Sequence, residues 1–268
     1  MTNTPKRRLN YNTQTKSKPK KVVNKASSKR KVWTAKILTL YPEMFPGALN
    51  HSVTGRALKD NLWSFETLNI RDFASGKHKN VDGSPAGGGP GMVLKADAVD
   101  KSIHFASRGL TSPSDSWPII FLTPRGSPLS DQTVKCLATK QGITIVCGRF
   151  EGIDERVTEK WNMLEISIGD FVISGGEIAA MALIDSCVRH IPQVLGNEKS
   201  SKRESFSNGL LEYPQYTRPA SWKGLKIPEI LLTGNHEKIK LWRKEQSVNI
   251  TRERRPDLWQ KYKKKTNV

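Results

Sequence analysis

The feature that most restricts the fold is an alternation of largely apolar runs with helical patterns in the middle of the chain. The apolar runs predict strands at 118–126, 142–152 and 162–174, and the segments 130–139 and 176–191 have the spacing of helices. Strands without a polar face are buried on both sides. Because these strands alternate with helices, the sequence predicts an α/β fold with a mostly parallel sheet covered on both faces.

The preceding segments extend this pattern. We expect a strand that breaks at Pro42, a helix capped by Ser52 or Thr54, a further strand and a further helix. Their ranges are 32–45, 52–63, 64–73 and 97–106.

The composition divides the chain into four parts. Residues 1–31 form a basic tail, 32–195 carry the alternating pattern, and 196–207 are polar enough to be a linker. Residues 208–268 contain a charged helical pattern and are expected to form a small helical domain.

The net charge of +19 favours an anionic partner. The tail holds 11 Lys or Arg and no acid, and the remaining chain still has 33 basic against 25 acidic residues. The tail is interpreted either as a solvated disordered extension or as a tether that attracts phosphate. A basic body beneath it favours nucleic acid as the partner.

The sequence also bears on location. It has no run of about 18 apolar residues, so we expect no membrane span, and residues 1–31 lack the apolar core of a secretory signal. Cys136, Cys147 and Cys187 are odd in number and lack CxxC spacing, which argues against disulfides and a zinc site. We therefore expect a protein of the cytoplasm, where thiols stay reduced.

Glycine-rich loops are the candidate functional segments. The loops 122–129, 147–156 and 168–177 follow strands at the carboxyl edge, where open α/β sheets bind ligands. A fourth such loop is 78–92. Their glycines either approach a ligand closely or only turn the chain.

Familiar catalytic and nucleotide motifs are absent. Neither GxGxxG after the first strand nor GxxxxGK[ST] occurs, which argues against a dinucleotide or P-loop site. None of the five His residues has the surroundings of a catalytic triad, and Cys187, within an apolar helix, is interpreted as a core residue.

Six segments together resemble one family. They are "TLYPEMFPG", "NIRDFASGKHKNVDGSPAGGGPGMV", "LTPRGSPL", "CGRFEGIDERV", "SIGDFVISGGEIAAMALIDSCVR" and "ESFSNGLLEYPQYTRP". In this order they resemble the bacterial tRNA (guanine-N1)-methyltransferases of the TrmD family, from about Val32 to Trp259. The resemblance implies a SPOUT-type α/β domain with a trefoil knot and a small helical carboxyl-terminal domain. It also implies a homodimer with shared active sites, S-adenosylmethionine as methyl donor and guanine 37 of tRNA as acceptor.

The same resemblance assigns residues to the methyl donor. They lie in the loops at the predicted carboxyl edge of the sheet. The expected cofactor-binding residues are Phe121, Leu122, Pro124, Gly148, Phe150, Glu151, Ile168, Gly169, Asp170, Phe171, Val172, Ile173, Gly175 and Gly176.

Two residues carry the expected chemistry. Guanine N1 is protonated at neutral pH, so methylation needs a base and places negative charge on O6. By resemblance Glu204, where many relatives have Asp, is the base from the neighbouring protomer, and Arg189 stabilises O6. From the residues alone, a solvated linker acid is the favoured interpretation of Glu204, and Arg189 could instead be a favourable charge at a helix C-terminus.

The resemblance also assigns tRNA contacts. They are Asp82, Gly91, Ser200, Gln215, which replaces the His of many relatives, and Trp242, which could instead anchor the core of the helical domain. A response to Mg²⁺ is possible, but no ligand cluster marks a site. Two alternatives stay open, namely a knotted methyltransferase for ribose or ribosomal RNA, and an RNA-binding module without catalysis.

Overall fold

The computed structural model describes residues 32–110, 116–196 and 204–266. The basic tail and Ser200 lie outside these ranges. The main element is a five-stranded sheet in which every neighbouring pair is parallel, with the order β2-β1-β6-β5-β7. Its strands are β1 (Trp33–Thr39), β2 (Trp63–Asn69), β5 (Ile119–Pro128), β6 (Gly142–Cys147) and β7 (Leu164–Ser167). This confirms the expected α/β class with a mostly parallel sheet.

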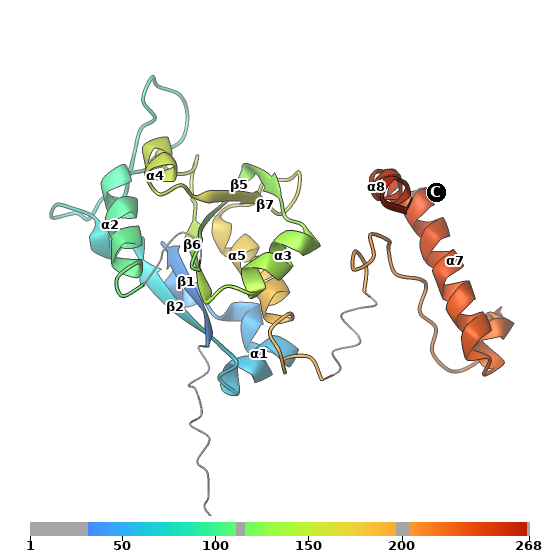
Figure 1. The fold of residues 1–268 in the computed structure, drawn as a ribbon. Helices are drawn as coiled ribbons and strands as arrows, with labels where there is room; N and C mark the ends of the chain where they lie inside the picture. The colour runs from blue at the N-terminus through green and yellow to red at the C-terminus, as the bar shows by residue number, and fades with distance from the viewer. Residues whose placement is uncertain (1–31, 111–115, 197–203, 267–268) are drawn as a thin grey trace, which may run out of the picture. The chain divides into compact units, whose positions relative to one another are not determined.

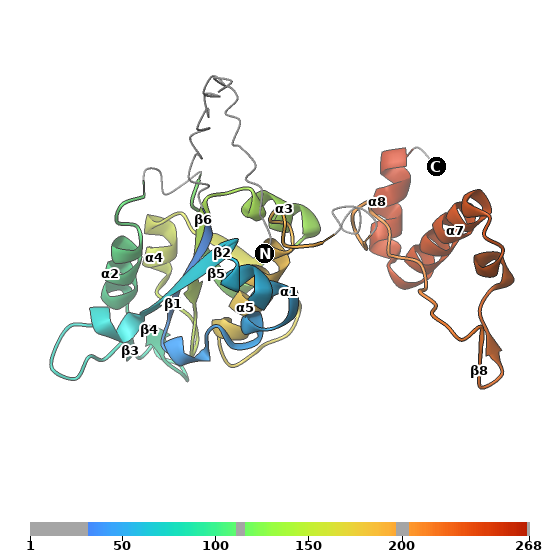
Figure 2. The same cartoon turned by 90° about the horizontal axis from the view of Figure 1, so that it is seen from below.

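Helices cover both faces of the sheet (Figures 1 and 2). One face carries α1 (Ser52–Lys59), α3 (Asp131–Ala138) and α5 (Gly176–Val188). The other carries α2 (Ala96–Ala106) and α4 (Glu155–Lys160).

Alternate strand residues belong to opposite cores. In β5, Ile120 and Leu122 pack with the α1, α3 and α5 side, whereas Ile119 and Phe121 pack with the α2 and α4 side. Successive side chains of a strand point to opposite faces, so a strand buried on both faces has no polar position. This is why the strands are continuous apolar runs in the sequence.

Several predicted boundaries are wrong. The expected strand 64–73 ends at Asn69, whose side chain accepts a hydrogen bond from the Arg71 amide at 3.0 Å and starts the 3₁₀ turn η3 (Ile70–Phe73). The expected strands 142–152 and 162–174 end at Cys147 and Ser167, where the site loops begin.

The predicted cap of α1 is also wrong. The N-cap is His51, and its side chain makes no capping hydrogen bond. Thr54 is buried, and its hydroxyl donates to the Asp185 carboxylate of α5 instead. A tertiary contact therefore uses the side chain that the local pattern assigned to the cap. Ser130, by contrast, caps α3 and accepts a hydrogen bond from the Thr133 amide at 3.1 Å.

Residues 204–266 contain a different set of elements. Residues 204–220 contain no helix or strand and form a strap that leads into the hairpin of β8 (Ser221–Trp222) and β9 (Leu225–Lys226). The turn η4 (Glu229–Leu232) and the helices α7 (His236–Arg254) and α8 (Pro256–Thr266) follow. The strap is tied to α7 because the Leu211 amide donates to the Thr251 hydroxyl at 2.8 Å. The hairpin was not predicted from the sequence.

The remaining short elements lie between β1 and α2 in the sequence. The turns η1 (Pro42–Met44) and η2 (Gly47–Asn50) connect β1 to α1. The strands β3 (Asp82–Gly83) and β4 (Val93–Leu94) pair antiparallel, and the segment 78–92, which contains β3 and ends directly before β4, is called the glycine-rich loop below. No helix in the described ranges is long and apolar enough to cross a bilayer.

Candidate functional site

A pocket of about 230 Å³ opens at the carboxyl ends of β5, β6 and β7. It is bounded by the end of β5, by the loop after β6, by the loop after β7 and by the first turn of α5. All predicted cofactor residues except Asp170, which is exposed, line it. They are Phe121, Leu122, Pro124, Gly148, Phe150, Glu151, Ile168, Gly169, Phe171, Val172, Ile173, Gly175 and Gly176.

The β5 wall of the pocket is a bulge. Leu122 and Ser127 both pair with Ile166 of β7, so the intervening residues leave the ladder. Gly126 permits the close return, since a Cβ atom there would collide with the Ile166 backbone nitrogen. The predicted loop 122–129 is thus a bulged strand that directs Thr123 and Pro124 to the pocket.

The two glycines before α5 pack against the neighbouring loop. The Gly176 amide donates to the Gly148 carbonyl at 2.9 Å, and a Cβ atom on Gly176 would lie 2.8 Å from the Cys147 Cα. A Cβ atom on Gly175 would collide with the Arg149 guanidinium. The backbone at Gly175 is extended, with φ of 177°. Close approach of neighbouring groups, not a special φ, is therefore why both positions need glycine.

A buried ion pair joins the same two loops. An Arg149 guanidinium nitrogen lies 2.9 Å from the Glu177 carboxylate, with side chains 18% and 1% exposed. The Thr39 hydroxyl donates to the same carboxylate at 2.7 Å, and Arg149 donates to the Ser174 carbonyl at 3.2 Å. The guanidinium also lies over the Tyr41 ring at 4.4 Å. Arg149 thereby connects β1, the β6 loop and α5.

The glycine-rich loop meets the pocket at Glu151. The Glu151 amide donates to the Met92 carbonyl at 2.9 Å, and a Cβ atom on Gly91 would collide with the Glu151 carboxylate. Gly91 has φ of +86°, so a side chain there would be strained as well as crowded. Asp82 does not line the pocket and lies in β3, where it pairs with Leu94 of β4.

One residue of the pocket has an unusual backbone. Phe150 has φ of +59° although it is not a glycine, and its ring is half exposed at the pocket. Such conformations cost about 1–3 kcal/mol and cluster at functional sites. The pocket loop is thus held in a conformation that the phenylalanine alone would not favour.

Sequence reasoning missed several lining residues. Arg149 and Ser174 lie inside the segments that marked the site, and Ala179 is one helical turn after Gly176. Their signal in the sequence was that they lie next to residues already assigned to the site. The missed residues are Thr123, Arg149, Ile166, Ser167, Ser174 and Ala179.

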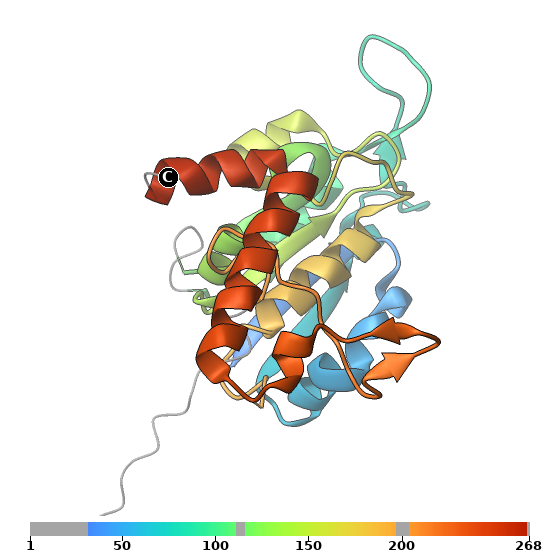
Figure 3. The same cartoon turned by 90° about the vertical axis from the view of Figure 1, so that its right-hand side faces the viewer.

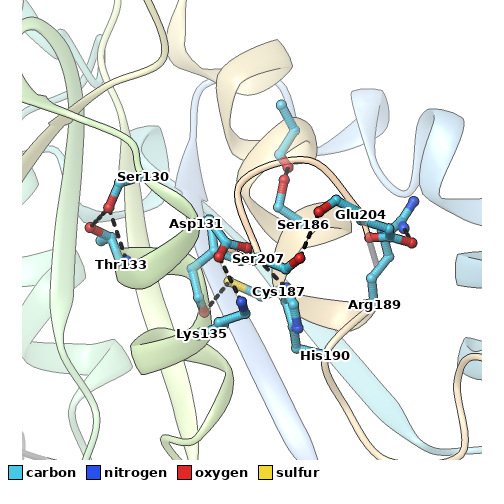
Figure 4. A network of polar contacts seen from close by, with 12 residues as sticks. Ser130, Asp131, Thr133, Lys135, Ser186, Cys187, Arg189, His190, Glu204 and Ser207 are labelled. Atoms are coloured by element: carbon cyan, nitrogen blue, oxygen red, sulfur yellow. Dashed lines mark hydrogen bonds and ion pairs between the residues drawn. The ribbon is translucent and has the colours of Figure 1, made fainter. Parts of the chain in front are cut away.

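The predicted catalytic residues lie elsewhere in the chain (Figure 4). Arg189 is the C-cap of α5, and its guanidinium contacts Glu204 Oε1 at 2.5 Å. Gly176 starts α5 at the pocket, so thirteen residues at 1.5 Å each place Arg189 roughly 20 Å further along the helix axis. Glu204 lines a second pocket of about 170 Å³ between the strap and α7. One protomer therefore does not bring this pair to the first pocket.

Polar residues surround the Arg189–Glu204 pair. Figure 4 shows His190 directed toward Asp131 and Lys135 of α3. The His190 Nε2 lies 3.9 Å from Asp131 Oδ1, and Lys135 pairs with the same carboxylate at 2.6 Å. Burial lowers the pKa of His190, and Asp131 opposes that shift. The neutral imidazole is thus favoured beside Arg189.

The remaining predicted tRNA residues lie in 204–266. Gln215 is exposed and donates to Glu212 at 2.5 Å. Trp242 is half-buried, with its ring 6.4 Å from that of Tyr216. Trp242 therefore makes one ring contact within this part of the chain.

The thiols and the search for metal ligands give no further centre in the described ranges. Burial raises the pKa of Cys187 to about 12 and that of Cys147 well above its usual value, so neither is a ready thiolate. This agrees with the interpretation of Cys187 as a core residue. The described residues contain no group of three or more His, Cys, Asp or Glu that could hold a metal ion.

Comparison with known proteins gives one consistent family. Residues 33–261 match the family described as tRNA (Guanine-1)-methyltransferase TrmD. A relative from Ruegeria sp. (strain TM1040), named tRNA (guanine-N(1)-)-methyltransferase, is 56% identical over 231 residues, or 86% of this chain and 93% of that protein. Relatives of the same name from Cereibacter sphaeroides (strain KD131 / KCTC 12085) and Brucella ovis are each 54% identical, covering 92% of their own lengths and 86% and 85% of this chain.

Proposed function

The chain belongs to the tRNA (guanine-1)-methyltransferase family TrmD, and on this premise we propose that it methylates N1 of guanine 37 in tRNA. The observation that carries the proposal is the pocket at the sheet edge. Three segments that mark the family meet there, although Phe121 at its β5 wall and Gly176 at the start of α5 lie far apart in the sequence.

We propose S-adenosylmethionine as the ligand of this pocket. When bound, it supplies an electrophilic methyl group on a sulfonium. The lining fits its chemistry, because Leu122 and Ile173 offer apolar contact, Glu151 offers a carboxylate, and loops around Gly148 and Gly175 expose peptide groups. Peptide groups can read the edges of an adenine where side chains would leave no room.

Glu204 and Arg189 are the proposed catalytic pair. Glu204 would accept the N1 proton, and Arg189 would stabilise negative charge on O6. Their ion pair supports this assignment, because it already places the guanidinium and the carboxylate side by side. Arg189 contacts Oε1 of the carboxylate, so Oε2 can turn to the purine.

The separation between this pair and the pocket, roughly 20 Å along α5, supports a shared site. In a two-fold dimer each contact occurs twice, so a second protomer could bring its Arg189 and Glu204 to the pocket of the first. We therefore propose the homodimer that the resemblance implies, with the carboxylate supplied by the neighbouring protomer.

The remaining architecture of the proposal follows the family. It comprises a trefoil knot in the 32–195 domain, a linker at 196–207 and a tRNA-binding domain at 208–268. Gly91 beside Glu151 supports a role for the glycine-rich loop near the acceptor base, with Asp82 behind it. The free cysteines agree with a cytoplasmic enzyme.

The test is the position of the methyl group. Purified protein, S-adenosylmethionine and an unmodified tRNA transcript should give 1-methylguanine at position 37. A transcript with adenine at position 37 should accept no methyl group there. Methylation of a ribose, or tRNA binding without any transfer, would support one of the two alternative functions and contradict this proposal.

A further inference from the structure

The hairpin of β8 and β9, drawn as a pair of arrows in Figure 3, consists entirely of exposed residues. Every residue from 215 to 226 is exposed. Trp222 is 58% and Leu225 is 68% exposed. An isolated two-stranded hairpin is marginal in water, and a large apolar side chain at its end gains nothing from solvent. A contact surface explains this exposure.

The hairpin presents its aromatic residue in a defined geometry. Trp222 pairs directly with Leu225, so both side chains lie on the same face. Lys223 and Gly224 form the two-residue turn, with φ of +51° and +84°, which suits the twist of a tight hairpin. The Lys223 ammonium lies 5.1 Å from the centre of the Trp222 ring. A cation and a flat apolar ring are thus held side by side.

The charge around this face has a single sign. Residues 213–228 contain Arg218, Lys223 and Lys226 and no Asp or Glu. An exposed aromatic ring among cations without a carboxylate matches single-stranded nucleic acid, whose bases stack and whose phosphates attract cations. A second copy of this strongly basic chain is a poorer match, because like charges would meet.

We propose that the β8–β9 hairpin is an RNA-contact element of this enzyme. Trp222 stacks on an unpaired base of the tRNA, with Leu225 beside it, while Lys223, Lys226 and Arg218 contact phosphates. The inference rests on the proposed function, since it assumes that tRNA is the substrate. It adds a stacking contact that is separate from Gln215 and Trp242.

The experiment measures tRNA affinity for the full chain at several salt concentrations. Trp222→Ala should weaken binding about fivefold or more, because base stacking on an aromatic ring is worth about 1–3 kcal/mol per base. Trp222→Phe should retain most of the affinity. The double variant Lys223→Gln and Lys226→Gln should reduce the salt slope by about 1.4, since each single-strand phosphate contact contributes about 0.7.

Phe105→Ala is the matched control. Phe105 is 41% exposed and lies 5.2 Å beneath the Arg108 guanidinium, so it is a second exposed aromatic–cation pair, on α2. Its loss should leave tRNA affinity unchanged. S-adenosylmethionine affinity should stay at the wild-type value in all of these variants, which checks that they fold.

Three results would overturn the inference. The first is wild-type tRNA affinity in Trp222→Ala together with an unchanged salt slope in the lysine variant. The second is a change in particle mass in Trp222→Ala, which would make the hairpin a contact between protein copies. The third is a wild-type protein that neither binds nor methylates tRNA, which would remove the proposed function as well; the first two leave that function intact.

Discussion

Arg149 shows how one side chain can hold a binding loop. Its partner Glu177 is almost fully buried, and a buried carboxylate without a partner is costly. The two charges stay paired only while the β6 loop lies against the start of α5. The charge of Arg149 therefore couples the shape of the pocket to the stability of the fold.

We predict that Arg149→Met destabilises the protein by about 3 kcal/mol or more, because it leaves Glu177 buried with a lone hydroxyl partner. Urea unfolding followed by circular dichroism measures the change. Arg125→Met is the matched control, since Arg125 pairs with Glu155 at 2.8 Å with both side chains more than half exposed. Its loss should cost under about 1 kcal/mol. Equal losses in the two variants would contradict the role given to Arg149.

Glu204 and Arg189 test the assigned chemistry. Glu204→Gln removes the proton acceptor, and Arg189→Ala removes a donor to O6 that is worth about 3 kcal/mol of barrier. Each should lower single-turnover methylation at least about a hundredfold. Calorimetry should show wild-type affinity for S-adenosylmethionine, because neither residue lines the pocket of its own chain and both are assigned to the purine. Wild-type turnover in either variant would remove that residue from the mechanism.

The start of α5 depends on contact with the end of β6. Gly176 begins the helix where it touches the Cys147 and Gly148 backbone, so the helix and the loop cannot move independently. The same contact places the first turn of α5 at the pocket. The proposed cofactor pocket and the packing of α5 thus share one backbone junction.

We predict that Gly176→Ala weakens S-adenosylmethionine binding and costs about 1–3 kcal/mol of stability, because overpacking forces the backbones apart. Calorimetry and thermal unfolding measure the two effects. Gly196→Ala is the control, since a Cβ atom there would have no neighbour within 4 Å. If both variants behave like wild type, the junction tolerates movement and the packing argument is wrong.

The elements that the sequence predicted best are those that local pattern determines. Apolar runs identified the buried strands, and helical spacing identified the segments of α3 and α5. The prediction of the α1 cap was wrong because the Thr54 hydroxyl donates to Asp185, which lies far along the chain in α5. Arg149 was missed because its partner carboxylate also belongs to α5, beyond the whole of α4 and β7. The hairpin at 221–226 was missed although its Lys-Gly turn carried a local signal.

The candidate site divides in the same way. Motif resemblance gathered residues that line one pocket, because motif and pocket both follow the strand ends. It also paired Arg189 with Glu204, which the structure places in contact. The sequence pattern could not predict the distance between the Arg189–Glu204 pair and the pocket, since that distance follows from the length and direction of α5. That separation is the reason to expect two chains at each site.

Mixing two inactive variants tests this sharing. One is Glu204→Gln, and the other is Ala179→Met, which fills the pocket floor with a flexible side chain and should abolish cofactor binding. If each site uses the pocket of one protomer and Glu204 of the other, subunit exchange at equal amounts should restore about a quarter of wild-type activity, because half of the two-fold dimers are mixed and each has one intact site.

The controls are each variant alone, before and after the same exchange procedure, and a mixture of Glu204→Gln with the double variant that carries both Glu204→Gln and Ala179→Met. All three should stay inactive. No recovery in the mixture, with exchange verified by mass, would mean that one chain supplies both pocket and carboxylate. In that case the strap that carries Glu204 would have to travel the length of α5 when tRNA binds, and the separation would describe a conformational change within one protomer.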